Sequence, residues 1–244
     1  MPRKARKVSS TGIYHIMIRG INRQSIFLDK EDNEKFLQIV EECKVLSEFN
    51  LYGYCLMGNH VHLLLREGKE KLELIFKRIG SRYVHWYNKK HLRCGHLFQD
   101  RYKSEAVESD QYFVVALRYI HQNPIRAGLS KSCGDYKWSS YNNYIGAKGI
   151  VDCEFAHNII GINNFERFMN DACAENCLEE CHKLGDSELI EEIKRRHGIE
   201  AKMIQNEPKK AIESLLKRIL EIDGISTRQV SRVTGIPANI IWKL

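Results

Sequence analysis

Two histidines separated by a single residue, His60 and His62, are the first candidates for chemistry in this chain. They open the apolar run at 60–66, which predicts a β-strand. Side chains alternate across a strand, so both imidazoles project from one face with Cα atoms about 7 Å apart. Imidazole nitrogens commonly bind divalent metals, and the pair predicts a metal site. For an isolated pair, two histidines with no metal are the commoner arrangement.

Tyr119 is the candidate nucleophile. It lies on a helix predicted over 110–122 and ended by Pro124, and Asn123 follows one turn later, where an amide oxygen could complete a metal site. A tyrosine hydroxyl, with an ordinary pKa near 10, is a weak nucleophile that needs a nearby cation or a metal-polarised phosphate. The chain has eleven tyrosines, and a packed core aromatic is the alternative role for this one.

Hydrophobic periodicity predicts the elements that must position these residues. Gly58-Asn59 is a two-residue turn signal between two of the strands. The predicted order is β-α-β-β-α-β-α, which is typical of an α+β, ferredoxin-like split βαβ fold with an antiparallel sheet. The predicted elements are strands at 11–20, 51–57, 60–66 and 97–107 and helices at 29–48, 70–90 and 110–122.

The sequence predicts that the whole chain has three parts. They are a catalytic domain at 1–148, an acidic helical region with a linker at 149–208, and an all-helical module at 209–244. The linker is expected at 206–210. In the last part, helices at 211–221 and 227–233 and a third opening at Pro237 have the spacing of a helix-turn-helix. Asn239 and Lys243 fall on its recognition element, although a helical hairpin used only for packing is the alternative.

Charge favours a polyanionic partner. The formal net charge is +7, and residues 76–103 carry eight Lys or Arg against one acid, Asp100. Such a basic stretch is typical of nucleic-acid binding, although a solvent-exposed basic helix with no binding role is the alternative. Candidate contacts to DNA phosphates are Arg3, Lys4, Arg19, Arg23, Arg101 and Lys103. Tyr102 could stack on an unpaired base.

Composition also bears on location and redox state. No stretch is long and apolar enough for a membrane span, and the basic N-terminus lacks the apolar run of a secretory signal. We therefore expect a cytoplasmic protein with reduced thiols. Cys173, Cys177 and Cys181, next to His182, share a helical face. Their spacing is unusual for zinc, so small apolar core residues are the preferred interpretation.

Several motifs in one order resemble the REP-associated tyrosine transposases, relatives of the small insertion-sequence transposases with an HUH (His-hydrophobic-His) motif. The resemblance spans residues 12–144, a little over half of the chain. Family members usually carry proline at the position of Gly58, and residues 151–210 match no known segment. The matching segments are 14–24 (YHIMIRGINRQ), 57–64 (MGNHVHLL), 95–104 (GHLFQDRYKS), 118–128 (RYIHQNPIRAG) and 138–141 (WSSY).

The resemblance implies an HUH nuclease fold in which His60, His62 and Asn123 hold Mg²⁺ or Mn²⁺. It implies that Tyr119 attacks single-stranded or hairpin DNA, giving a 5′-phosphotyrosine and a free 3′-hydroxyl. It also favours a monomer over a homodimer. Ligand chemistry alone would favour Zn²⁺ or Mn²⁺ over Mg²⁺. Two alternatives stay open: a non-cleaving DNA-binding regulator that uses the C-terminal module, and a metal-dependent phosphodiester hydrolase that uses water. His15 could face the metal from a neighbouring strand or be a core histidine.

Overall fold

The computed structural model divides into two compact units, Met1–Leu178 and Glu179–Leu244, each described here by itself. It describes residues 6–99, 101–171, 177, 185–220, 222, 225 and 227–241. The predicted positions Arg3, Lys4, Lys243, Cys173, Cys181 and His182 lie outside the described residues.

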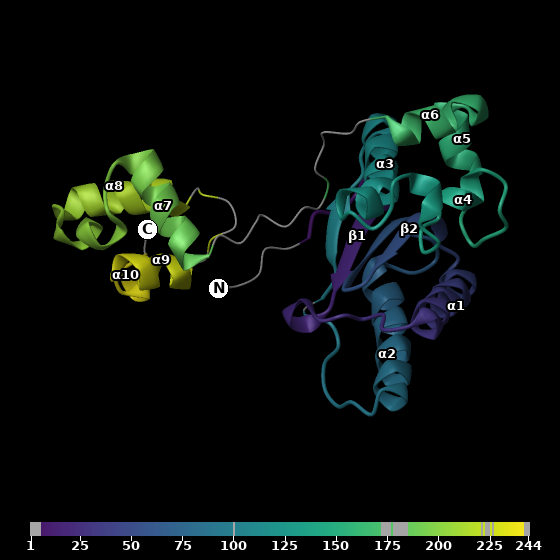
Figure 1. Ribbon diagram of the computed structural model, residues 1–244, viewed down its shortest axis with the longest axis horizontal. Helices are drawn as coiled ribbons and strands as arrows, with labels where there is room; N and C mark the ends of the chain where they lie inside the picture. Colours follow the sequence, from purple (N-terminus) through teal and green to yellow (C-terminus); the bar gives the residue numbers. More distant parts are fainter. Residues whose placement is uncertain are drawn as a thin grey trace. The chain divides into compact units, whose positions relative to one another are not determined.

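A four-stranded antiparallel sheet forms the centre of the first unit (Figure 1). Its order is β2-β3-β1-β4, the order that a ferredoxin-like βαββαβ chain produces, so the predicted fold class is confirmed. The strands are β1 (Ile13–Arg19), β2 (Asn50–Met57), β3 (His60–Arg66) and β4 (Lys103–Ala106).

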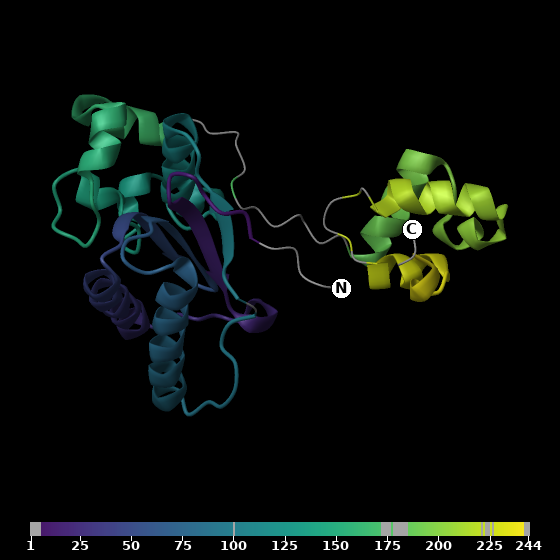
Figure 2. The same cartoon turned by 180° about the vertical axis from the view of Figure 1, so that it is seen from behind.

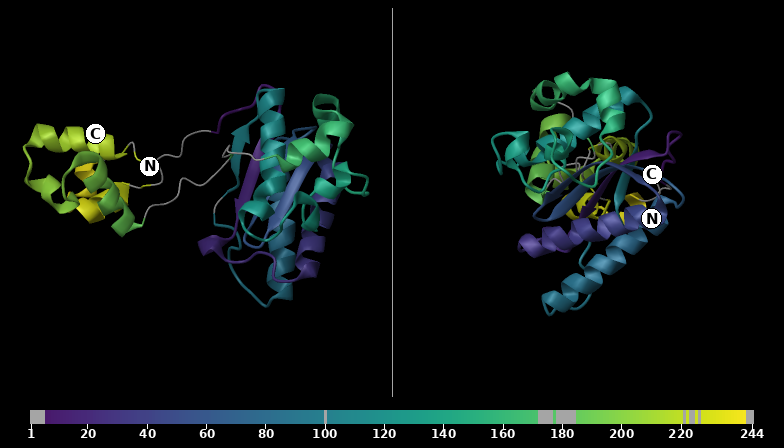
Figure 3. Two further views of the ribbon diagram at one scale, coloured as in Figure 1. Left: turned by 45° about the horizontal axis from the view of Figure 1, so that its top comes forward. Right: turned by 90° about the vertical axis from the view of Figure 1, so that its right-hand side faces the viewer.

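Helices cover both faces of the sheet (Figures 2 and 3). On one face, α1 (Lys30–Ser47) and α2 (Leu72–Lys90) pack over Ile16, Val61 and Leu63, all fully buried. On the other face lies α3 (Asp110–Arg126), with α4 (Tyr141–Tyr144), α5 (Glu154–Ile160) and α6 (Phe165–Asn170) beside it. Because side chains alternate along a strand, the two faces carry different residues, and the histidines of β1 and β3 all fall on the α3 side.

Two predicted boundaries are wrong. Strand β4 covers only Lys103–Ala106, because residues 97–99 contact the end of β1 through isolated hydrogen bonds, among them Gln99 N to Arg19 O (2.9 Å). Helix α3 runs past Pro124 to Arg126, since the next turn is closed by Ala127 N donating to Asn123 O (3.0 Å). A proline can stand inside a helix where the one lost bond is tolerated. Asn123 is therefore held at a regular helical position one turn after Tyr119.

The Gly58-Asn59 turn is present between β2 and β3, but neither residue has positive φ, so the conformational freedom of glycine is not what selects it. A Cβ at Gly58 would meet no atom within 4 Å. After α3, the 3₁₀ turn Cys133–Asp135 precedes the short helix α4.

The second unit is all helical, as predicted. It comprises α7 (Asp186–His197), the 3₁₀ helix η4 (Ala201–Asn206), α8 (Lys209–Leu220), α9 (Thr227–Thr234) and α10 (Ala238–Ile241) around an aliphatic core. Residues 206–210, expected as a linker, join η4 to α8 within this unit. Residues 149–170 instead pack with the first unit, and the division of the chain into three functional parts stays a prediction.

Among the described helices none is both long enough and apolar enough to cross a membrane.

A buried histidine next to the site predicts how stability depends on pH. His121 is fully buried, and desolvation lowers its pKa to about 3. Between pH 6.5, its pKa in the unfolded chain, and pH 3, the unfolded state binds one proton more. The free energy of unfolding should therefore fall by about 1.4 kcal/mol per pH unit below 6.5 for this residue alone. Urea unfolding of the wild type and His121→Leu should show a shallower pH dependence in the variant. The exposed His85→Gln is the control, and equal slopes in wild type and His121→Leu would contradict the interpretation.

Candidate active site

His60 and His62 lie at the start of β3, on the face covered by α3. Their ring centroids are 5.0 Å apart at an interplanar angle of 83°. His62 is 2% exposed and His60 is half-buried. The alternation of β3 thus brings the two imidazoles together at the edge of the buried face.

A third histidine, His15 of β1, contacts His62. The pairing of β1 with β3 sets Met17 opposite His62, which places His15 diagonally beside it. His15 Nε2 lies 2.9 Å from His62 Nδ1, and the ring centroids are 5.1 Å apart. A hydrogen bond at Nδ1 means that His62 would bind an ion through Nε2. In the same way, His60 Nδ1–H donates to Asn59 Oδ1 (2.6 Å), so His60 would also use Nε2.

Tyr119 packs against this imidazole cluster, which we define as His15, His60 and His62. Its ring centroid is 5.8 Å from that of His15 and 5.7 Å from that of His62, both edge-on, and its side chain is 5% exposed. Asn123 Nδ2 donates to the Tyr119 carbonyl (2.9 Å), which leaves Oδ1 as the atom able to contact a cation. The structure thus brings the expected nucleophile into contact with the expected metal ligand His62.

Arg126 was not singled out from the sequence. Its guanidinium lies over the Tyr119 ring, 4.8 Å from the centroid. The seven-residue spacing, two helical turns, is the signal that could have found it. It was overlooked because the helix was expected to end at Pro124. A guanidinium at this distance favours negative charge developing on the phenol.

Burial holds two members of the imidazole cluster, His15 and His62, in the uncharged form. Desolvation lowers the pKa of His15 to about 3. It also holds the pKa of His62 well below its usual range, and the positive charges of His15, His60 and Arg19 act in the same direction. Neutral imidazole is the form that binds metals. Two imidazole nitrogens and one amide oxygen form a mixed donor set that suits Mn²⁺ and fits Mg²⁺ less well, since Mg²⁺ favours oxygen ligands.

The expected DNA contacts lie in different places. Arg19 ends β1 opposite His60, and Lys103 on β4 pairs with Met17, so both fall on the face of the imidazole cluster. Arg23 is exposed in the 3₁₀ turn after β1, and Arg101 is exposed before β4. Asn239 is exposed on α10 in the second unit.

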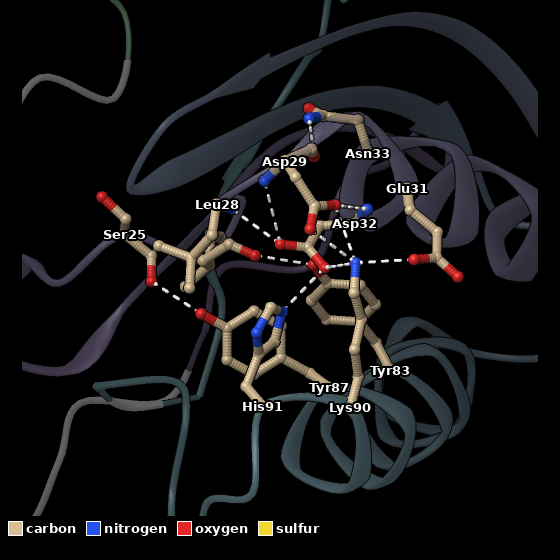
Figure 4. A network of polar contacts seen from close by, with 11 residues as sticks. Ser25, Leu28, Asp29, Glu31, Asp32, Asn33, Tyr83, Tyr87, Lys90 and His91 are labelled. Atoms are coloured by element: carbon tan, nitrogen blue, oxygen red, sulfur yellow. Dashed lines mark hydrogen bonds and ion pairs between the residues drawn. The ribbon is translucent and has the colours of Figure 1, made fainter.

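A different group, on the α1–α2 side, has the geometry of a possible metal site. Asp29, Asp32 and His91 each place one ligand atom within 4.8 Å of the others. Figure 4 shows that the Lys90 ammonium already lies among these carboxylates, 2.7 Å from Asp29 and 2.9 Å from Asp32. Burial alone would raise the pKa of Asp32, but hydrogen bonds from His91, the Leu28 amide and Lys90 outweigh it and lower the pKa. The group therefore carries its own cation and ties α1 to α2.

Residues 8–123, a little under half of the chain, match the family described as "Transposase IS200 like". Among curated proteins the chain is similar to the REP-associated tyrosine transposase of Escherichia coli (strain K12), with 21% identity over 126 residues, which are 50% of this chain and 72% of that protein. A solved structure of the REP-associated tyrosine transposase bound to a REP hairpin matches with a TM-score of 0.54 and 16% identity, over 73% of this chain and 100% of that chain. At this identity the match establishes the fold alone.

The contacts of Lys90 with Asp29 and Asp32 predict an effect on thermal stability. Lys90→Gln should lower the Tm by several degrees, because Asp32, which is fully buried, would lose its cationic partner. Thermal unfolding checks it, with the exposed neighbour Lys89→Gln as control. An unchanged Tm in Lys90→Gln would contradict a stabilising role for the contact between Lys90 and Asp32. Recovery of the lost Tm by added Mn²⁺ would instead identify this group as a metal site.

Proposed function

We propose that the chain is a metal-dependent single-strand DNA endonuclease and strand transferase that acts through Tyr119. The observation that carries the proposal is the edge-on packing of Tyr119 against His62 and His15, both of which are buried and uncharged. The match of residues 8–123 to the IS200-like transposase family favours a DNA-cleaving enzyme.

His60 and His62, through Nε2, and Asn123, through Oδ1, would hold Mn²⁺ or Mg²⁺. When bound, the ion would polarise the scissile phosphate as a Lewis acid. Tyr119 Oη attacks phosphorus; the Oη–P bond forms, the P–O3′ bond breaks, and the 5′-phosphate stays on tyrosine. The phenolic proton passes to solvent, and the departing 3′-oxygen takes a proton from water. Arg126 stabilises the phenolate both before attack and when a 3′-hydroxyl reverses the step.

Single-stranded or hairpin DNA is the substrate class that we propose, since the similar solved structure holds a REP hairpin. Arg19 and Lys103 lie on the face of the imidazole cluster, where they can position phosphates without reading sequence. The exposed Asn239 of the helical second unit is the candidate for a further DNA contact. A monomer is the assembly that we favour.

The two alternative functions, a phosphodiester hydrolase and a non-cleaving regulator, predict different results. In a hydrolase, water would replace Tyr119, and no covalent product would form. In a non-cleaving regulator, nothing would require His60, His62 and Tyr119 to converge. The convergence favours the transferase over both.

Replacement of the nucleophile tests the proposal directly. Wild type incubated with labelled hairpin DNA and Mn²⁺ should give a labelled band at protein mass on a denaturing gel, and Tyr119→Phe should lose it while still binding DNA. Tyr112→Phe, two turns earlier on the same helix, is the matched control and should keep the band. Cleavage by Tyr119→Phe without a covalent band would establish the hydrolase. Tight binding without cleavage by the wild type on any hairpin would favour the regulator.

His15 gives a second test, through metal affinity. His15→Phe keeps an aromatic ring in the buried position but removes the partner of His62 Nδ1. Loss of such a partner typically weakens metal binding about 10- to 100-fold. The Mn²⁺ concentration for half-maximal adduct formation should rise by that factor, with activity restored at high Mn²⁺. His85→Gln, on the other side of the sheet, should leave the Mn²⁺ requirement unchanged, and an unchanged requirement in His15→Phe would show that the contact is structural.

A further inference from the structure

A hollow of about 410 Å³ lies on the sheet face opposite the imidazole cluster, where α2 meets the end of β1 and the segment leading into β4. This volume falls in the range of small-molecule sites. A second hollow of about 470 Å³ adjoins it and shares Arg6, Glu73, Arg101 and Tyr102. Nothing in the transferase chemistry proposed above uses either one.

Aromatic rings line the first of these hollows. Phe76 and Tyr102 lie 4.6 Å apart between centroids, and Phe98 and Ile18 also line the hollow. The Arg6 guanidinium covers the Tyr102 ring at 4.1 Å and donates to the Tyr102 carbonyl (3.1 Å). Aromatic and guanidinium surfaces are what unpaired bases stack on, whatever their sequence.

Gly80 keeps the hollow open. It lies inside the 19-residue helix α2, where glycine is disfavoured relative to alanine. A Cβ there would meet only the Phe98 ring, at 4.0 Å, so close packing does not require glycine. Because Gly80 and Phe98 both line the hollow, a longer side chain at position 80 would project into the space beside Phe98.

The rim is cationic. Arg6, Lys77 and Arg101 line the first hollow against one carboxylate, Glu73, which lies 3.7 Å from Arg6. The second hollow adds Lys7 and Lys71 together with one carboxylate, Glu67, which pairs with Lys71 (3.0 Å). This charge is complementary to a phosphodiester backbone, whereas an apolar peptide would gain little from it.

The two faces of the sheet meet at β4, which is its edge strand. Lys103 points to the face of the imidazole cluster, and Arg101, two residues earlier, lines the hollow. A single strand could therefore pass around this edge from Tyr119 to the hollow, with cations along its path. We infer that the hollow holds one unpaired DNA base of the strand that flanks the scissile phosphate, with the neighbouring phosphates on Lys77 and Arg101. The inference rests on the proposed function for its choice of substrate.

Photocrosslinking tests it in the full chain. Mixed-sequence single-stranded DNA carrying 5-iodouracil is bound in chelator, so that no cleavage occurs, then irradiated, and the crosslinked peptides are mapped. Wild type should crosslink at Phe76, Phe98 or Tyr102. Gly80→Leu, which fills the hollow with a good helix former, should lose these crosslinks and bind the DNA roughly 5- to 100-fold more weakly, the range expected for one stacked base. Ser81→Leu, exposed on the same helix, should match the wild type.

The first hollow is not a base site if the wild-type protein crosslinks to DNA only at residues other than Phe76, Phe98 and Tyr102. The same result is expected if the chain's own N-terminal residues fill the hollow, and it would also contradict the inference. The same holds if Gly80→Leu binds and crosslinks like the wild type. Should Gly80→Leu not fold, Lys77→Glu, at an exposed position, must show weaker binding or the inference fails. The covalent band assay on the same DNA with Mn²⁺ separates the two proposals. A band without crosslinks in the hollow leaves the transferase standing alone, and crosslinks without a band leave the base site standing alone.

Discussion

The antiparallel pairing of β1 with β3 is the constraint on which both faces of the first unit depend. One register sets Ile16 and Ile18 among the residues buried under α1 and α2, and sets His15 beside His62 under α3. Because side chains alternate with a period of two, a slip by one residue would exchange the two sets. The fully buried aliphatic face therefore fixes the register, and the register in turn holds the imidazole cluster together.

Much of this arrangement follows from the sequence, because alternation in a strand and periodicity in a helix are local. The shared face of His60 and His62, and of Tyr119 and Asn123, needs no knowledge of the tertiary fold. The contact between His15 and His62 could not be predicted in the same way, since it depends on which residues of two distant strands lie side by side. The position of Arg126 could not be predicted for a local reason: a proline usually ends a helix, but Pro124 does not end α3.

The sheet face under α3 carries buried polarity that a purely structural core would avoid. His15, His62 and His121 are all buried and neutral, and among the described residues His15 Nδ1 has no hydrogen-bond partner. A buried unpaired donor or acceptor costs about 1–3 kcal/mol. His121 Nδ1 likewise has no partner among the described residues, while its Nε2 contacts Ser140 Oγ (2.9 Å) among the aromatic rings of the core. The polarity near Tyr119 is of the kind found where function opposes stability.

Two polar clusters on opposite faces of one sheet show how a cation requirement can be inferred. Asp29 and Asp32 are anionic, and the Lys90 ammonium already pairs with both, so this cluster holds α1 and α2 together without an added ion. Burial keeps His15 and His62 of the imidazole cluster uncharged, and the cluster lies beside Tyr119 and Arg126. Neutral nitrogen ligands bring no charge of their own to a phosphate. Their use in phosphoryl chemistry would therefore gain from a bound cation, which is the physical argument for proposing a metal at His60 and His62 rather than at Asp32.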